Sequence, residues 1–283
     1  MATTPKILEN IPARVLEIHN KPKQLYYKGV FPEGDFKFLS VVGSRKFTNY
    51  GKDACESMIA GLEGYPIVIV SGLALGIDTI AHESAIRAGL RTIAIPGSGL
   101  GEKVLYPRSN FALANKILKS GGCLLSEFEE NFAVTAWSFP MRNRIMAALS
   151  HAVLIIEAEE KSGSLITARL GMEYNRDVLV LPGPVFSPQS AGTNALLKDG
   201  AHPCTSAKDI LEILGFKEQE KINKNYDNCT DEERVVLELL YEPTSKEELM
   251  QKYSGSATDL NMVLSLLEIK GHIKETMGEI RKV

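Results

Sequence analysis

Long hydrophobic runs and paired cysteine motifs are missing from this sequence. No apolar run approaches the ~18 residues that a membrane-spanning helix needs. The cysteines show no C-x-x-C spacing, which disfavours a zinc site and a dense disulfide framework. They are Cys55, Cys123, Cys204 and Cys229. The N-terminus has no apolar stretch behind a basic one, so we expect no cleaved secretory signal, no membrane segment, no metal and a location in the reducing cytoplasm.

Several enzyme motifs are missing too. The sequence has no Walker A motif, no G-x-S-x-G nucleophile elbow and no H-E-x-x-H metal motif. Gly97, Gly99 and Gly101 have G-x-G-x-G spacing rather than that of a dinucleotide fingerprint, and they follow the third predicted strand rather than the first. The net charge of −3 excludes a basic field over the whole protein, so nucleic-acid binding would depend on a local patch.

What the sequence does have is a regular alternation of short apolar runs and amphipathic stretches between residues 38 and 215. The runs are rich in Val and Ile and apolar at successive positions, which is typical of strands in a parallel sheet with both faces covered. They are residues 38–42, 67–71, 92–96, 123–127, 152–158 and 177–182. The stretch 78–89 has a helical period and ends at a glycine suited to a helix C-terminus. We predict a doubly wound α/β domain with a mostly parallel sheet of six or seven strands.

The remaining segments differ from this core. Residues 1–37 have no clear period and lead into the first predicted strand. Residues 216–229 are polar and are predicted to be a linker. Residues 230–283 have three helical patterns, 231–241, 245–253 and 257–270, and then a predicted hairpin that turns near Gly278. This order is that of a small C-terminal winged-helix domain.

The charge of this C-terminal domain argues against DNA binding. Residues 230–283 have 11 Asp and Glu against 7 Lys and Arg. The third pattern, where a winged helix has its recognition helix, carries Asp259 and Glu268 against only Lys270. A helix that binds duplex DNA needs cations for the phosphates. We therefore interpret the domain as a protein contact or a structural cap.

Glycine and serine follow most of the predicted strands, which places exposed backbone N–H groups along one edge of the sheet. Ligands of open α/β sheets bind at that edge. Gly43, Ser44 and Arg45 follow the first strand, and they form either an anion site or a tight turn with a solvated arginine. Residues 71–78 form a long glycine turn, with Asp78 as the predicted N-cap of the next helix. His82 is interpreted as a core or helix-face residue.

Two further stretches could bind anions. After Phe139, two arginines, Arg142 and Arg144, flank Asn143 at the start of a predicted helix over 141–149, where arginines oppose the helix dipole and need an anionic partner. That partner is either a bound anion, beside a Phe139 ring that can stack on a base, or one of Glu127, Glu129 and Glu130. Residues 161–164 (Lys-Ser-Gly-Ser) form either a phosphate loop or a capped helix start with an exposed lysine.

These stretches together resemble the DNA-processing A (DprA/Smf) family. The similarity rests on six motifs in the same order: 41–51, 71–89, 99–110, 139–150, 157–168, and 181–183 with 192–201. The resemblance implies an extended Rossmann-like core. It also implies a protein that is not an enzyme, that binds single-stranded DNA, protects incoming DNA and loads a RecA-type recombinase in natural transformation. Homodimers are implied as well.

The resemblance also implies a DNA-binding pocket without catalytic residues, metal or cofactor. Its residues would be Gly43, Ser44, Arg45, Phe139, Arg142, Asn143, Lys161, Ser162 and Gly163, with Ser71, Gly72 and Asn194 on the same rim. Arg45 and Lys161 would pair with phosphates and Phe139 would stack on or wedge between bases. A Rossmann-fold enzyme that acts on a nucleoside phosphate is the alternative hypothesis, because fold alone does not decide function.

Overall fold

The computed structural model describes residues 4–216, 229–240, 244–276 and 278–282. The chain divides into two compact units, Met1–Glu218 and Gln219–Val283, which are described separately. Of the predicted linker 216–229, residues 217–228 lie outside the described residues. Among the described residues, no helix combines the length and the apolar character needed to cross a bilayer.

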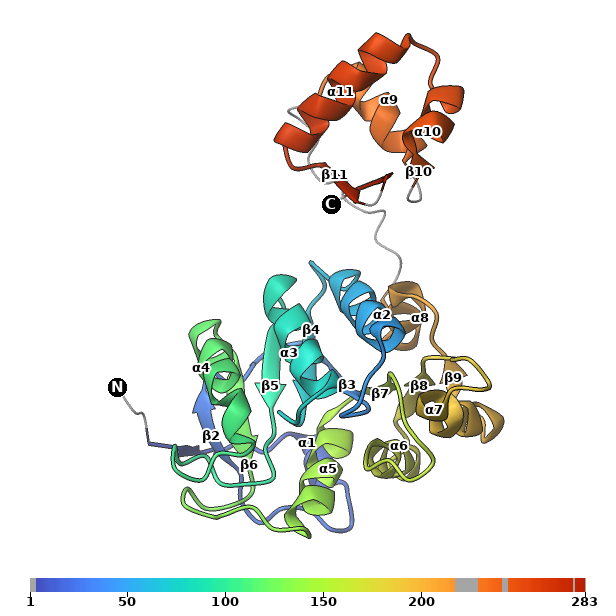
Figure 1. Cartoon of the computed structure of the whole chain (residues 1–283). Coiled ribbons are helices and arrows are strands. Elements are labelled where there is room, and N and C mark those ends of the chain that lie inside the picture. The colour runs from blue at the N-terminus through green and yellow to red at the C-terminus, as the bar shows by residue number, and fades with distance from the viewer. Residues whose placement is uncertain (1–3, 217–228, 241–243, 277, 283) are drawn as a thin grey trace. The chain divides into compact units, whose positions relative to one another are not determined.

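The first unit contains a nine-stranded sheet in the order β1-β2-β6-β5-β4-β3-β7-β8-β9 (Figure 1). The strands are β1 (Lys6–Ile7), β2 (Tyr26–Gly29), β3 (Lys37–Val42), β4 (Ile67–Ser71), β5 (Arg91–Ala94), β6 (Cys123–Ser126), β7 (Ala152–Ile155), β8 (Asp177–Val180) and β9 (His202–Pro203). From β6 through β9 every neighbouring pair is parallel, whereas β1 and β2 are antiparallel. The chain builds outward from β3 in one direction and then, from β7 on, in the other. The predicted doubly wound, mostly parallel α/β fold is confirmed.

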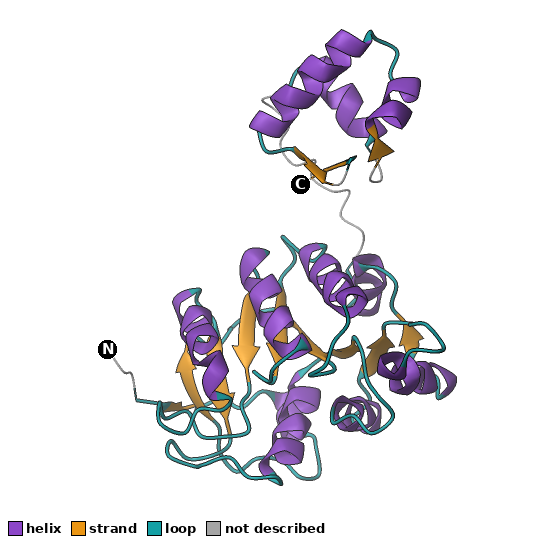
Figure 2. Ribbon diagram, in the orientation of Figure 1, coloured by secondary structure: helices purple, strands orange, loops and turns teal. Residues whose placement is uncertain are grey.

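Helices cover both faces of this sheet (Figure 2). One layer holds α2 (Asn49–Ala60), α3 (Ile77–Arg87), α4 (Phe111–Lys119) and α8 (Ala207–Ile213), and the other holds α1 (Ala13–Leu16), α5 (Ser138–Leu149), α6 (Ser164–Glu173) and α7 (Pro188–Lys198). Strand β4 shows why both layers are needed: Ile67 and Ile69 belong to one buried cluster, and Val68 and Val70 to the other. Successive side chains of a strand point to opposite faces, so an apolar run requires cover on each side.

The sheet has more strands than the six or seven predicted. Two of the additional strands come from the N-terminal segment 1–37, whose sequence showed no period. Both residues of β1 are exposed, and β2 contains polar residues and a glycine, so neither strand has a hydrophobic alternation. Strand β9 is only two residues long, and both are exposed. Short edge strands of this kind are held by pairing with a neighbour rather than by their own apolar pattern.

The second unit has its own core. Its helices are α9 (Asp231–Leu239), α10 (Lys246–Lys252) and α11 (Ala257–Ile269). The strands β10 (Thr244–Ser245), β11 (Ile273–Thr276) and β12 (Glu279–Lys282) form a separate sheet in which β12 pairs antiparallel with both others. Val236, Leu260 and Leu267 are buried where the helices meet. The three helices and the β11–β12 hairpin follow the predicted order, and β10, between α9 and α10, was not predicted. The winged-helix assignment stays a prediction.

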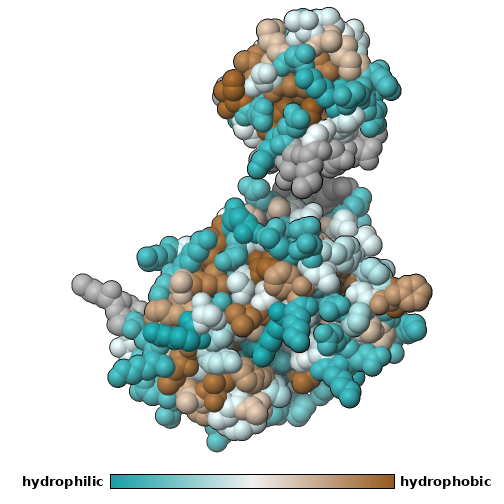
Figure 3. Space-filling model, in the orientation of Figure 1, coloured by the Kyte–Doolittle hydropathy of each residue, from teal (hydrophilic) through white to brown (hydrophobic). Residues whose placement is uncertain are grey.

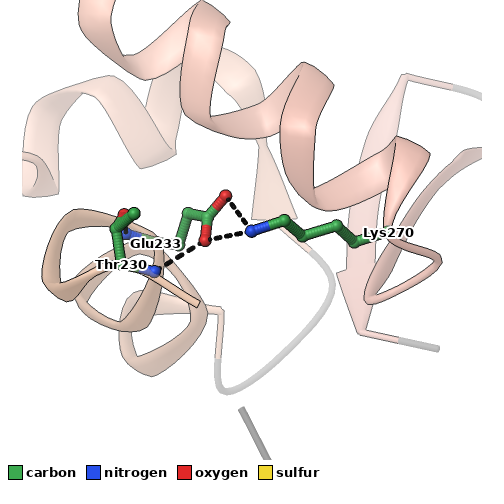
Figure 4. A network of polar contacts seen from close by, with 3 residues as sticks. All are labelled: Thr230, Glu233 and Lys270. Carbon is green, nitrogen blue, oxygen red and sulfur yellow. Dashed lines mark hydrogen bonds and ion pairs between the residues drawn. The ribbon is translucent and has the colours of Figure 1, made fainter. Parts of the chain in front are cut away.

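A buried ion pair joins the first and third helices of the second unit (Figure 4). Glu233 is 1% exposed and accepts hydrogen bonds from Lys270 Nζ at 2.8 and 2.7 Å. It also accepts one from the Thr230 backbone N–H at 2.8 Å, which completes a capping box at the start of α9. The hydrogen bonds from Lys270 lower the pKa of Glu233. Lys270, the one cation of the predicted recognition helix, is therefore engaged within the protein.

We expect Lys270→Met to destabilise the second unit by about 2 kcal/mol, because it leaves the buried Glu233 carboxylate without its charged partner. Hydrogen exchange of α9 amides in the full chain measures this loss. Lys252→Met is the matched control, since Lys252 pairs with Glu248 across one exposed turn and should change stability by less than about 0.5 kcal/mol. Equal exchange in the two variants would contradict a stabilising role for the buried pair.

Candidate nucleic-acid interface

A pocket of about 320 Å³ opens at the carboxyl ends of β3 and β7, which are neighbours in the centre of the sheet. The chain order reverses between these two strands, and open α/β sheets bind their ligands at such a point. Loop 43–48 follows β3, loop 156–163 follows β7, and the N-terminal half of α5 supplies a third wall. Three segments that are far apart in the sequence thus meet at one site.

This pocket brings together most of the residues predicted for the site. Its lining includes Gly43, Ser44, Arg45, Phe139, Arg142, Asn143, Lys161, Ser162 and Gly163. Gly72 lies beside it, in a smaller hollow that shares Arg45, Phe139 and Arg142 with the pocket. Ser71 and Asn194 line neither. Ser71 is fully buried and donates to the Val41 carbonyl at 2.7 Å, while Asn194 exchanges hydrogen bonds with the Gly183 backbone.

Glu157 ties the two loops together through Thr48. Its carboxylate is 2% exposed and accepts from the Thr48 backbone N–H at 2.9 Å and from the Thr48 hydroxyl at 2.6 Å. Thr48 is also the N-cap of α2, and its oxygen accepts from the Gly51 N–H. Within loop 43–48, Ser44 Oγ bonds both the N–H and the C=O of Lys46 at 3.0 Å. These contacts hold the two loops at a fixed separation.

The charge of the pocket is positive although that of the whole chain is negative. The cations of Arg45, Lys46, Arg142 and Lys161 outnumber the carboxylates of Asp78 and Glu159 in its lining. Arg45 and Lys161 are exposed, and in the part of the chain that the structure describes neither forms an ion pair within 4.0 Å. The Arg45 guanidinium lies 5.6 Å from the centre of the Phe139 ring. Both cations are therefore available to an anion.

The start of α6 adds hydroxyl groups to this rim. Helix α6 begins at Ser164 directly after Gly163, without a side-chain N-cap and without an acidic residue in its first turn. Ser162 and Ser164 bring their hydroxyl oxygens within 2.6 Å of each other, and both residues line the pocket. The first N–H groups of α6 are hydrogen-bonded within the turn: Ser164 N–H donates to Ser162 Oγ at 3.3 Å, and the N–H groups of Leu165 and Ile166 donate to the carbonyls of Ser162 and Gly163 at 3.2 Å. Residues 161–164 thus start the helix as a capped turn and also present the exposed Lys161 and two hydroxyls to the pocket, so both interpretations of this stretch stay open.

Arg142 lies under the pocket rather than at its mouth. Its side chain is buried, and its Nη1 donates to the carbonyls of Gly72 and Ile95 while Nε donates to Asn143 Oδ1 at 3.0 Å. Burial lowers the pKa of Arg142 to about 10, so the guanidinium stays charged at neutral pH. A Cβ on Gly72 would lie 1.8 Å from Arg142 Nη1, so only glycine allows this close approach. Arg142 therefore holds the β4–α3 and β5 loops together.

Asp78 does not have the role predicted for it. Helix α3 begins at Ile77 with Gly76 as N-cap, so Asp78 is inside the helix. Its Oδ2 accepts instead from the N–H groups of Gly72 and Ala74, at 3.1 and 3.3 Å. Burial raises the pKa of the Asp78 carboxyl, and Arg142 and the two amide hydrogen bonds oppose that rise. The N-cap of α3 is two residues earlier than the sequence pattern predicted, so Asp78 lies past the capping position.

Helix α5 also begins earlier than predicted, at Ser138 instead of residue 141. Arg142 is therefore in the second turn of α5. The helix dipole acts mainly on the first turn, so it opposes the Arg142 charge less than the sequence analysis predicted. The ion-pair alternative applies to Arg144, which pairs with Glu127 and donates to the Asn20 carbonyl. Arg142 takes backbone carbonyls as its partners, which neither interpretation of the sequence included.

Other lining residues were not in the predicted set. They are Val42, Lys46, Ala74, Asp78, Met146, Glu159, Ser164 and Thr167. Lys46 directly follows Arg45, and Ser164 belongs to the stretch 161–164, so their neighbours in the sequence could have indicated them. Thr167 lies one turn further on, inside α6. Val42 and Met146 are buried apolar residues of a strand and a helix, and nothing in their pattern distinguishes them from the rest of the core.

His82, the histidine considered in the sequence analysis, is buried away from the pocket. His82 is fully buried, its Nδ1 lies 2.7 Å from Thr92 Oγ1, and burial lowers its pKa to about 3. This places His82 in the core, as the sequence indicated. Among the described residues, no group of three His, Cys, Asp or Glu side chains could hold a metal ion.

Comparison with known proteins gives consistent results over the first unit. Residues 5–215 match the sequence model of the family described as DNA recombination-mediator protein A. The chain is 39% identical over 208 residues to Protein Smf of Escherichia coli, covering 74% of this chain and 55% of that protein. It is 42% identical over 200 residues to DNA processing protein DprA of Streptococcus pneumoniae, covering 71% and 70%. The match thus spans little more than half of the Escherichia coli relative.

Solved structures agree with the sequence comparison. The X-ray structure of DprA from Streptococcus pneumoniae matches with a TM-score of 0.66 and 39% identity, covering 74% of this chain and 72% of that one. DprA from Helicobacter pylori, whose structure concerns its single-stranded DNA binding mode, matches with a TM-score of 0.66 and 34% identity, covering 74% and 95%. With a family match over most of its length and relatives of this similarity, the chain belongs to the DNA recombination-mediator protein A (DprA/Smf) family.

Proposed function

We propose that this protein binds single-stranded DNA in the pocket between β3 and β7 and acts as a recombination mediator. The observation that carries the proposal is the combination of two unpaired cations, Arg45 and Lys161, with the Ser162 and Ser164 hydroxyls and the Phe139 ring around one pocket. Cations and hydroxyls suit phosphates, and an aromatic ring suits an unpaired base. The Helicobacter pylori relative, whose structure is reported for its single-stranded DNA binding mode, supports the same class of ligand.

Single strands suit this site better than duplex. A rim of hydroxyls and a few cations contacts phosphates and stacked bases, but it has no helix or ribbon shaped for a DNA groove. In a duplex the base faces are stacked on one another, so Phe139 could reach one only after local unpairing. Because stacking uses the face that every base has, we propose little base specificity.

The finer parts of the function rest on membership of the family. We propose that the protein protects incoming DNA, loads a RecA-type recombinase onto it, forms homodimers and works in the cytoplasm during natural transformation. Stimulated assembly of a RecA-type filament on single strands covered by a single-strand-binding protein would test the loading activity. Sedimentation of the full chain would test the dimer.

We expect oligo-dT to bind more tightly than a duplex of equal length. The reason is that the pocket offers a ring, hydroxyls and cations to unpaired nucleotides and no groove-reading element. Fluorescence anisotropy with both labelled probes, each at two salt concentrations, measures the difference and its electrostatic part. Equal affinities for single strand and duplex would sink the proposed function.

The second unit should contribute little to this binding. Besides the ion-paired Lys270, the exposed face of α11 presents Met262, Leu266 and Ile269, which are 57%, 40% and 82% exposed. The space-filling view shows such hydrophobic surface on this unit beside hydrophilic surface (Figure 3). A helix that enters a groove would present Arg or Lys there.

We therefore expect a chain ending at residue 218 to stay folded and to keep its affinity for oligo-dT within about threefold. The truncation removes a unit with a net negative charge, so the affinity for oligo-dT at low salt should stay the same or rise. A gel shift of segment 219–283 on random duplex DNA near physiological salt is the complementary measurement, with no shift expected. Tight, salt-sensitive binding by that segment would make it a second DNA site and overturn this assignment.

A further inference from the structure

A shallow hollow lies beside the pocket, on the other side of the wall formed by Arg45 and Phe139. Both side chains line the pocket and the hollow alike. The rest of the hollow is formed by the turn after β4 and the loop after β5, mainly Leu75, Tyr106 and Pro107. At about 30 Å³ it is too small to enclose a nucleobase, so a base there would lie across its mouth.

The side chains around this mouth are unusually apolar for an exposed rim. Tyr106 is 41% exposed and Leu75 is 49% exposed. The Tyr106 and Phe139 rings meet edge to face, with centroids 5.9 Å apart and planes at 62°. Single exposed apolar residues are normal on any protein surface. Here an aromatic and an aliphatic side chain border the same hollow next to the unpaired cation of Arg45, and that arrangement calls for a ligand with both a flat apolar face and a negative charge.

Backbone contacts hold Tyr106 in place. Its N–H donates to Ser98 Oγ at 3.2 Å, and Ser98 is fully buried. Ser98 in turn accepts, through its own carbonyl, the hydroxyl of Ser126 at the end of β6. The tyrosine ring is thus presented from a loop anchored to the sheet edge. A fixed ring loses little entropy when a base stacks on it.

We propose that Tyr106 and Leu75 form a second base subsite, which holds the nucleotide adjacent to the one in the main pocket. This inference rests on the proposed function. The Phe139 ring would separate the two bases, and Arg45, which lines both cavities, would contact the phosphate that links them. The ligand class is a single strand of at least two nucleotides, recognised by stacking and therefore without regard to sequence.

Two probes separate this subsite from the main pocket. Thymidine 5′-monophosphate has one base and one phosphate, so it fills the main pocket alone. Oligo-dT of twelve nucleotides reaches both. We expect Tyr106→Ala in the full chain to lower affinity for the oligonucleotide about 5- to 100-fold, the range for loss of a stacked base. The same variant should bind the monophosphate as the wild type does, and Tyr106→Phe should bind both probes normally.

Two further variants complete the design. Leu75→Ser should weaken oligonucleotide binding in the same direction by a smaller factor, and it keeps the test valid if Tyr106→Ala fails to fold. Tyr50→Ala is the matched control, since Tyr50 is 48% exposed and lines neither cavity. It should change neither affinity.

Each other outcome has a distinct meaning. Unchanged oligonucleotide affinity in folded Tyr106→Ala and Leu75→Ser would overturn the second subsite and leave the proposed function intact. An equal loss for the monophosphate and the oligonucleotide would also overturn it, because Tyr106 would then only shape the main pocket. A wild-type protein that binds neither probe would refute the proposed function itself.

Discussion

Replacing Arg45 by alanine is expected to weaken oligo-dT binding by about 10- to 100-fold without unfolding the protein. Arg45 is exposed, lies over the Phe139 ring and has no ion-pair partner among the described residues, so the folded state depends little on its charge. A charge-assisted hydrogen bond in a shaped pocket contributes about 1.5–3 kcal/mol, and the expected factor covers most of that range. Anisotropy titrations of the two proteins at one salt concentration measure it.

Lys119→Ala is the control for this substitution. Lys119 is an exposed cation at the end of α4 and lines neither the pocket nor the hollow, so salt should screen most of its effect. We expect less than a twofold change. If the two folded variants lost affinity by the same factor, the interaction would be diffuse, and the pocket would have no special part in it.

Arg142→Ala should act mainly on stability, with a loss of about 3–5 kcal/mol. The substitution removes the stronger of the two cations that act on the buried Asp78 carboxylate, leaving only Arg45, and it takes a donor from the carbonyls of Gly72 and Ile95. Removing one member of a buried charge pair costs about this much. Urea unfolding followed by the fluorescence of Trp137, the single tryptophan, reports on the first unit because Trp137 precedes α5.

The two arginine substitutions are thus expected to have different effects on stability. Arg45→Ala should unfold within about 0.5 kcal/mol of the wild type, as surface substitutions usually do. Arg142→Ala that unfolds at the wild-type urea concentration but no longer binds DNA would show that the guanidinium works in the pocket instead of supporting the loops. Arg142 would then have to leave its carbonyl partners when DNA binds.

The location of the candidate site followed from the sequence because parallel strands carry their carboxyl ends to one edge. Glycine-rich stretches after β3 and β7 had to lie near each other once the alternation of strands and helices was recognised. The fold class and the family resemblance are both confirmed for the same reason: they rest on long, repeated patterns. Ser71 shows the limit, since it is the last residue of β4 and its hydroxyl bonds the neighbouring strand.

Side-chain directions were harder to predict. Arg142 and Arg144 are two residues apart on α5, so they point to widely different sides of the helix, one to Gly72 and the other to Glu127. Which of them faces the pocket depends on how α5 packs, and the sequence pattern does not contain that. The strands of residues 1–37 were missed for a related reason, because β2 pairs with β6, which is remote in the sequence, and β1 is held only by β2.

The most direct test of the central claim is to locate bound DNA on the protein. Oligo-dT carrying photoreactive 5-iododeoxyuridine can be cross-linked to the full chain and the modified peptides identified by mass spectrometry. We predict cross-links at Phe139 and in the loops that follow β3, β5 and β7, lost in Arg45→Ala. Cross-links confined to residues 229–282, or to the helices away from this edge, would contradict the account.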